Sequence, residues 1–249
     1  MLRLGLAAAL VLCGAAAHAA ELSDAIPPLK SADVFGAQNA GQLAPYLRAL
    51  VGLTLLSFIP AALMAMTSFT RTLITLSFIR HAIGLPETPP TAVLVTLSIF
   101  MTMFVMGPTL EKAQAQAFTP FMDGRMNLQQ AAKAGVEPFK QFMSAHVREQ
   151  DVALVSEMAR KPLPAKAQEA DLQVLVPAFM LSELRVAFSV GFVIFLPFLL
   201  VDLIVSAVLM SLGMMMMPPA TVSLPLKLLL FVLIDGWGLV VRAIAGSYQ

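Results

Sequence analysis

The sequence is poor in charged residues. Of its 249 residues only 12% are charged, whereas 58% are hydrophobic. A soluble domain carries about 25% charged residues, so this chain has about half of the charge that covers a water-facing surface. The 16 Lys and Arg nearly balance the 15 Asp and Glu, which leaves no basic field for nucleic acid. The composition therefore argues against a soluble enzyme and against a nucleic-acid-binding protein, and it favours a membrane protein.

Residues that could do covalent chemistry are also scarce. The chain has one cysteine, Cys13, and three histidines. It lacks a G-x-x-x-x-G-K-[ST] phosphate loop, an H-E-x-x-H metal pair and a G-x-S-x-G nucleophile elbow. We therefore expect no catalytic residue, no bound metal and no cofactor.

The first 19 residues have the pattern of a cleavable signal peptide. Arg3 precedes an apolar core at residues 4–17, and Ala17 and Ala19 place small side chains at the expected cleavage site. Cleavage after Ala19 removes Cys13, so the mature chain forms no disulfide. The alternative is an uncleaved membrane anchor, which the short core disfavours.

Long uncharged runs divide the remaining chain. Two of them, of 22 and 23 residues, are long enough to cross a bilayer as helices, and two further runs are interrupted by single charges. We expect an all-α, polytopic membrane protein with about four hydrophobic spans, in two helical hairpins at residues 48–110 and 172–249. The uncharged runs lie at residues 49–70 and 88–110, and the interrupted ones at 186–212 and 224–241.

The segment 111–171 between the hairpins is water-soluble in character, because it holds 16 of the 31 formal charges, eight of each sign. A cleaved signal leaves the mature N-terminus outside, so residues 20–47 and 111–171 are expected in the periplasm. The loop 71–87 is then cytoplasmic, and its Arg71 and Arg80 agree with the positive-inside rule.

The soluble segment itself is predicted to be helical. Asn127 and Gln130 form a capping pair for a short helix that Gly135 ends. Pro138 suits the first turn of a second, amphipathic helix of about six turns that reaches Met158. On this helix His146 is predicted to be a partly exposed surface residue.

Two carboxylates, Asp202 and Asp235, fall within the last two apolar runs. A charged group at bilayer depth costs about 2.5–3.5 kcal/mol unless it is paired or hydrated. They are therefore either a proton or ion relay or polar groups that are paired inside a helix assembly. Lys227 precedes Asp235 by eight residues, too far for the two to meet on one straight helix.

The tip of the second hairpin, residues 213–219, is rich in methionine. Gly213 and the Pro218-Pro219 pair break the helix. Thioethers are flexible and polarizable, so several copies meeting around an axis could close a hole as a gasket. Copper(I) binding and an ordinary apolar loop are the alternatives. The methionines concerned are Met214, Met215, Met216 and Met217.

Several stretches together resemble the FliP family of flagellar type III export-gate proteins. The resemblance covers about residues 50–245 and includes the polar residues of the second hairpin, which are Glu183, Arg185, Asp202, Lys227 and Asp235. The stretches are TSFTR at 67–71, PAFMLSELRVAF at 177–188, LPFLLVDL at 196–203, LPLKL at 224–228 and FVLIDGW at 231–237.

This resemblance implies a role that composition does not show. Similar proteins assemble in several copies with FliQ and FliR, alongside FlhA and FlhB, into an export gate at the flagellar basal body in the inner membrane. Unfolded substrates pass through it, and no covalent chemistry is expected. In the family the methionine loop lines a constriction, which here falls on Met214, Met215 and Met216, with Met217 as an extra residue. The family's gate lies largely above the bilayer plane, which would make Asp202 and Asp235 tolerable.

Other functions stay open at this point. Gly107 before Pro108 is more similar to virulence-type injectisome homologues, whereas the signal and the Pro218-Pro219 pair are more similar to the flagellar branch. A proton-coupled transporter would use the two carboxylates, and a copper transporter would use the methionines. Four uneven spans without an internal repeat are few for a transporter.

Overall fold

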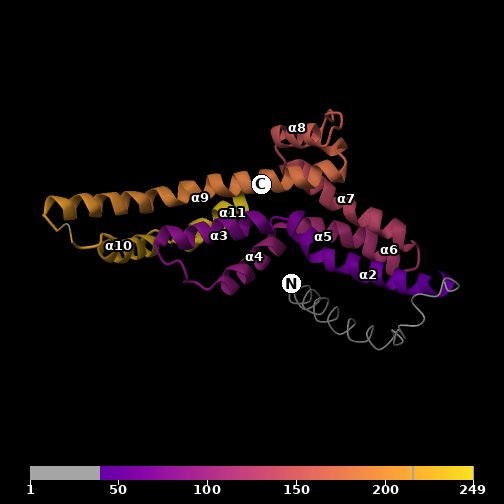
Figure 1. Ribbon diagram of the computed structural model, residues 1–249, viewed down its shortest axis with the longest axis horizontal. Coiled ribbons are helices and arrows are strands. Elements are labelled where there is room, and N and C mark those ends of the chain that lie inside the picture. Colours follow the sequence, from indigo (N-terminus) through magenta and orange to yellow (C-terminus); the bar gives the residue numbers. More distant parts are fainter. Residues whose placement is uncertain (1–39, 215, 249) are drawn as a thin grey trace. The chain divides into compact units, whose positions relative to one another are not determined.

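A computed structural model describes residues 40–214 and 216–248 of the chain (Figure 1). All regular secondary structure in these residues is helical, which confirms the all-α fold class. The signal peptide with Ala17 and Ala19 lies outside the described residues. The α-helices are α2 (Ala40–Ala65), α3 (Phe69–Ile83), α4 (Thr91–Val105), α5 (Gly107–Ala113), α6 (Thr119–Met122), α7 (Leu128–His146), α8 (Glu149–Met158), α9 (Leu172–Ser211), α10 (Ala220–Leu233) and α11 (Gly236–Gly246).

The chain divides into two units, residues 1–59 and residues 60–249, and the following description concerns the second. Among the described helices, α9 alone is long and apolar enough to cross a membrane. Two helix pairs qualify only as bent spans: α4 with residues 107–122, at 65°, and α10 with α11, at 63°. The described part therefore holds one candidate span, or up to three, and the number four stays a prediction.

The prediction that residues 71–87 form a loop is wrong, because α3 occupies most of them, whereas their cytoplasmic location stays a prediction. Leu76 and Ile79 recur at helical spacing and are fully buried, which stabilises a helix through this stretch. Gly84 ends the helix in the left-handed conformation, with φ of 90°. Arg71 and Arg80 are therefore residues of a helix, not of a loop.

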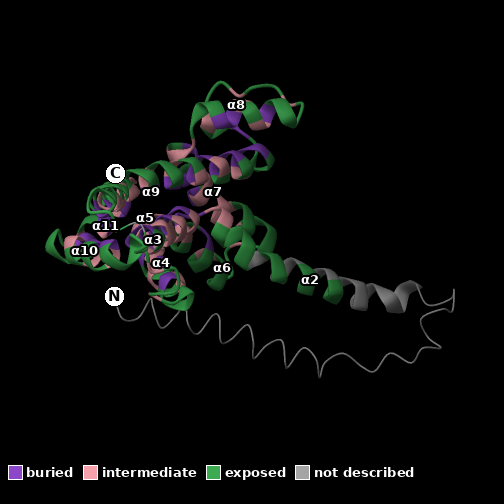
Figure 2. Cartoon of the chain, turned by 60° about the vertical axis from the view of Figure 1, so that its left-hand side comes forward, coloured by how far each residue is buried: buried purple, intermediate pink, exposed green. Residues whose placement is uncertain are grey.

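Two hydrophobic cores lie along α9. The hairpin core joins α3, α4, α9, α10 and α11 around side chains such as Leu76, Phe198 and Phe231. The insert core joins α7, α8 and the first half of α9 around Phe142 and Phe179. Figure 2 shows buried positions on α7, α8 and α9, with many exposed positions on the other sides of the helices.

α3 and α9 come close together at Gly191. A Cβ atom at this position would lie 2.6 Å from Cγ and Cδ2 of Phe78. The ring of Phe78 packs edge-on against Phe188, with 5.1 Å between ring centroids. The absence of a side chain at Gly191 thus lets the two helices meet.

In the soluble segment, residues 111–171, the structure confirms one prediction and contradicts two. The Asn127 side chain accepts from the backbone N–H of Gln130, and the Gln130 side chain accepts from the N–H of Asn127, so the capping box is present. However, α7 continues through Gly135 and Pro138 to His146. A Cβ at Gly135 would lie 3.4 Å from that of Ala117, so this glycine permits close packing instead of ending the helix.

The predicted six-turn helix from Pro138 to Met158 is also wrong. It is divided where Val147 and Arg148 adopt extended conformations, and α8 begins at Glu149. Both segments pack against α9, with Phe142 of α7 and Val152 of α8 in the same core.

Candidate functional site

The tip of the second hairpin connects the end of α9 to the start of α10, which pack against each other (Figure 1). Gly213 has φ of 74°, and its N–H donates to the carbonyl of Met210, while Met214 N–H donates to the carbonyl of Leu209. These two bonds form a Schellman motif, which requires the left-handed conformation that glycine adopts without strain. The sequence therefore ends α9 at the position where the methionines begin.

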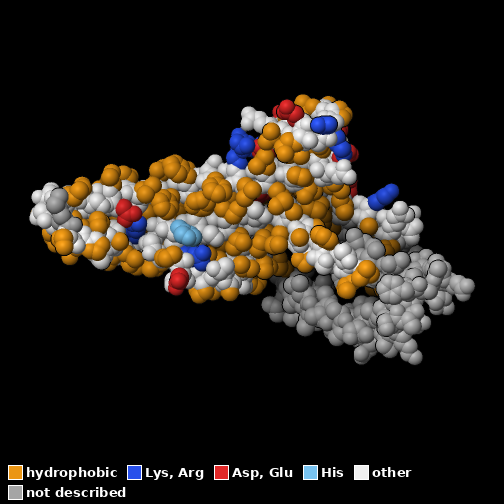
Figure 3. Space-filling model, in the orientation of Figure 1, with side chains coloured by type: hydrophobic (Ala, Val, Ile, Leu, Met, Phe, Trp, Pro, Cys, Tyr) orange, Lys and Arg blue, Asp and Glu red, His pale blue; other side chains and the backbone are white. Residues whose placement is uncertain are grey.

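The methionines of the tip that the structure describes are exposed. Met214 and Met217 are exposed, and the Met216 side chain is 99% exposed. Met215 lies outside the described residues. The structure thus presents apolar, flexible side chains at the end of a hairpin whose surface is itself largely hydrophobic, whereas charged side chains gather around α7 and α8 (Figure 3).

An ion pair joins the two helices of the hairpin below this tip. Lys227 Nζ donates to Asp202 Oδ2 over 2.5 Å. The Lys227 side chain is 8% exposed and that of Asp202 39%. A cavity of about 310 Å³ lies beside the pair, lined also by Gly84, Ser206 and Ser223. Of the two roles left open for Asp202, the geometry supports a paired group inside a helix assembly.

Asp235 lies at a helix break, not within a continuous span as expected. It adopts a left-handed conformation with φ of 49° between α10 and α11, and its side chain accepts from the N–H of Gly238 at 3.4 Å. Arg242 Nη2 lies 3.4 Å from the same carboxylate. An acceptor and a negative charge at a helix N-terminus are both stabilising, so Asp235 acts as a cap for α11.

Arg185 belongs to a polar contact between α8 and α9. Its Nη2 donates to Asp151 Oδ1 over 3.0 Å, and Ser182 Oγ donates to the other oxygen over 2.7 Å. The backbone N–H of Arg148 donates to Ser182 Oγ over 2.9 Å. Asp151 is fully buried, so these bonds compensate for the loss of its hydration.

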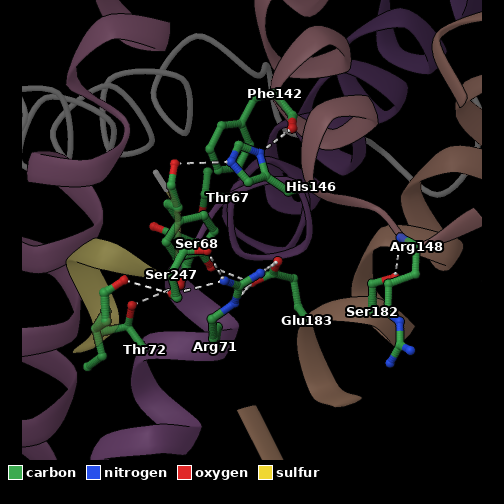
Figure 4. A network of polar contacts seen from close by, with 12 residues as sticks. Thr67, Ser68, Arg71, Thr72, Phe142, His146, Arg148, Ser182, Glu183 and Ser247 are labelled. Carbon is green, nitrogen blue, oxygen red and sulfur yellow. Dashed lines mark hydrogen bonds and ion pairs between the residues drawn. The ribbon is translucent and has the colours of Figure 1, made fainter. Parts of the chain in front are cut away.

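Glu183 forms a second, deeper ion pair with Arg71. Arg71 Nε and Nη2 donate to its two carboxylate oxygens over 2.9 and 2.5 Å. Only 4% of the Arg71 side chain and 1% of the Glu183 side chain are exposed. Figure 4 shows Ser247 on the other side of the guanidinium, where Arg71 Nη1 donates to its carbonyl and hydroxyl oxygens, each over 3.0 Å. Tyr248 also donates its hydroxyl to Glu183.

These pairings were not foreseeable from sequence spacing. Arg71 and Glu183 are 112 residues apart, and Asp202 and Lys227 are 25 apart on different helices.

Burial, together with the charge of Glu183, raises the pKa of Tyr248, so its hydroxyl stays protonated and available as a donor. His146, expected to be partly exposed, is half-buried, and its Nε2 lies 3.4 Å from the backbone carbonyl oxygen of Tyr248.

Comparison with known proteins shows the family of this chain. The model of the FliP family matches residues 52–244. Flagellar biosynthetic protein FliP of Pectobacterium carotovorum is 49% identical over 199 residues, covering 80% of this chain and 77% of the relative. The proteins of that name from Bacillus subtilis and Caulobacter vibrioides are 43% and 47% identical, covering 87% and 80% of this chain and 98% and 76% of their own. Because the family match extends over most of the sequence, this chain belongs to the FliP family.

Proposed function

We propose that this chain is a membrane component of the flagellar type III export apparatus and that several copies form its gate. Family membership supports a role in export machinery, not in enzymatic catalysis. The observation that carries the gate proposal is the exposed methionine tip at the end of the α9–α10 hairpin, with Met216 fully accessible.

The physical argument concerns closure of an irregular hole. A thioether side chain has three rotatable bonds and a polarizable sulfur, so a ring of such side chains fills gaps that branched residues leave open. Gly213 and Pro218 keep the tip out of both helices, and the Lys227–Asp202 pair ties its two arms together. The tip can therefore adapt while its supports stay fixed. The gasket consists of Met214, Met215, Met216 and Met217.

The remaining parts of the proposal follow from the same role. The partners are further copies of this chain, FliQ and FliR, then FlhA and FlhB, and unfolded flagellar substrates. The protein lies in the inner membrane at the basal body, with the signal removed and residues 111–171 in the periplasm. The similarity to flagellar biosynthetic proteins FliP favours the flagellar branch over the injectisome alternative.

The test replaces the three methionines Met214, Met215 and Met216 with alanine together. We expect assembly to be retained and the membrane to become permeable to ions and small polar solutes, measured as conductance or solute sensitivity. Met158→Ala serves as the control, because Met158 is a similarly exposed methionine on α8, away from the tip. Normal export with no added permeability in the triple variant would refute the gasket.

The triple variant, together with Asp202→Asn, distinguishes the gate from the two transporter alternatives. A copper transporter predicts that the triple variant loses copper(I) binding to the purified protein, whereas the gate proposal predicts no such binding before or after substitution. A proton-coupled transporter predicts that Asp202→Asn abolishes transport while the triple variant does not.

A further inference from the structure

The residues that follow α11 occupy the junction of the two hydrophobic cores. Val240 and Ile244 of α11 belong to the hairpin core, whereas Tyr248 packs against the insert core. α9 contributes side chains to both cores, and its Glu183 pairs here with Arg71 of α3, a helix of the hairpin core. Four separate parts of the chain therefore meet at Ser247 and Tyr248.

Tyr248 is held by contacts on each side of its ring. Its ring lies under the Arg71 guanidinium, with 3.8 Å from Cζ to the ring centroid. It stacks on Phe142 of α7, with 5.8 Å between ring centroids. Its hydroxyl donates to Glu183, and its carbonyl faces His146 Nε2. A cation–π contact, a stacked pair and a charge-assisted hydrogen bond each depend on a different helix.

Ser247 accepts the hydrogen bonds of Arg71 that do not go to Glu183. The guanidinium has five N–H donors, of which Nε and Nη2 supply bonds to Glu183. The two bonds from Nη1 go to Ser247. A buried cation that lost these acceptors would have donors without partners, which is strongly unfavourable. The buried ion pair and the two residues after α11 therefore depend on each other.

We propose that Ser247 and Tyr248 form a clasp that positions the Arg71–Glu183 pair and thereby fixes the end of α11 against both cores. The binding surface of the clasp is made by α3, α7 and α9. Since α11 directly follows α10 in the chain, across the break at Asp235, and α10 forms one arm of the tip, the clasp links that arm to the soluble segment. This inference stands on the contacts of the chain itself and does not depend on the gate proposal.

The test measures amide hydrogen exchange by mass spectrometry on the full-length, detergent-solubilised protein. Tyr248→Ala should speed exchange in α11 by about tenfold or more, since hydrogen bonds to charged groups are among the stronger ones. Peptides from α8, on the far side of the insert core, should keep their rate. Equal acceleration in α8 and α11 would mean that Tyr248 only contributes general stability and would overturn the clasp.

Two conservative variants, Tyr248→Phe and Glu183→Gln, distinguish the ring contacts of Tyr248 from the hydrogen bond of its hydroxyl. Tyr248→Phe keeps the ring between Arg71 and Phe142 and loses only the bond to Glu183, so we expect it to recover part of the protection lost in Tyr248→Ala. In addition, Tyr248→Phe should have a smaller effect in a Glu183→Gln background, because Glu183→Gln removes the charge that strengthens this hydrogen bond. Full additivity of the two changes would contradict the proposed coupling.

Ser247→Ala has a matched control in Ser211→Ala. Both hydroxyls donate to the carbonyl three residues earlier over 2.8 Å, Ser247 to Ile244 and Ser211 to Val208, but Ser247 alone also accepts from Arg71. We expect faster exchange in α11 for Ser247→Ala and unchanged exchange there for Ser211→Ala. The clasp is wrong if the two variants behave alike.

Discussion

Replacing Gly191 with alanine tests the packing of α3 on α9. In the interior of an exposed helix this change stabilises by about 1 kcal/mol, because glycine has a low helix propensity. Here the new Cβ would lie 2.6 Å from Cγ and Cδ2 of Phe78 and 3.0 Å from its Cβ. These atoms are close to the Phe78 backbone, so rotation of the ring does not remove the clash, and α3 and α9 must separate.

The cost exceeds the gain in helix propensity. Inserting a methyl group into a packed contact costs about 1–3 kcal/mol. Displacing Phe78 also weakens its edge-on contact with Phe188, a kind of pair worth about 0.5–1.5 kcal/mol. We therefore expect Gly191→Ala to lower the free energy of unfolding by about 1–3 kcal/mol, opposite in sign to the effect at an open helical site.

The assay is thermal unfolding of the detergent-solubilised protein. Gly52→Ala is the matched control, because Gly52 lies within α2 and a Cβ there meets no atom within 4 Å. Gly52→Ala should keep or raise the unfolding midpoint, whereas Gly191→Ala should lower it. Adding Phe78→Ala to Gly191→Ala should cost less than the two single changes summed. An unchanged or raised midpoint for Gly191→Ala would refute the close contact.

Three further predictions concern signal cleavage, the membrane topology and the Lys227–Asp202 ion pair of the hairpin. N-terminal sequencing of the assembled protein should begin near Ala20, and retention of the first residues would contradict signal cleavage. Alkaline phosphatase fused near Ala134 should be active and a fusion near Gly84 inactive, and the reverse pattern would invert the topology. Lys227→Ala should lower stability by about 1–2 kcal/mol. The charge-swapped pair Lys227→Asp with Asp202→Lys should restore part of it, and no restoration would argue against a direct pair.

Features that depend on neighbouring residues were predictable from the sequence. The capping box at Asn127 and Gln130 needs only four consecutive residues, and the structure contains it. The helical class follows from long uncharged runs, and the end of α9 follows from Gly213. Each of these depends on interactions within one or two helical turns, so the local pattern contains the necessary information.

Features that depend on distant partners were not predictable. Arg71 was interpreted as a cytoplasmic surface charge, because nothing near it in sequence reveals that Glu183 neutralises it inside the protein. Gly135 was expected to end a helix, because the sequence does not distinguish a glycine at a helix end from one that permits close approach. Asp235 was placed within a span, since the change of direction between α10 and α11 has no proline to mark it.

The length of α9 has a consequence for the path that an export substrate would take. At about 1.5 Å per residue, its 40 residues extend for about 60 Å, or about twice the hydrocarbon thickness of a bilayer. About half of the helix therefore extends beyond the lipid when α9 runs along the bilayer normal. An extended polypeptide advances by about 3.3 Å per residue, so a passage lined by α9 along its whole length would hold about 18 residues of cargo at once. An unfolded segment of fewer than about 18 residues could not extend from one end of such a passage to the other.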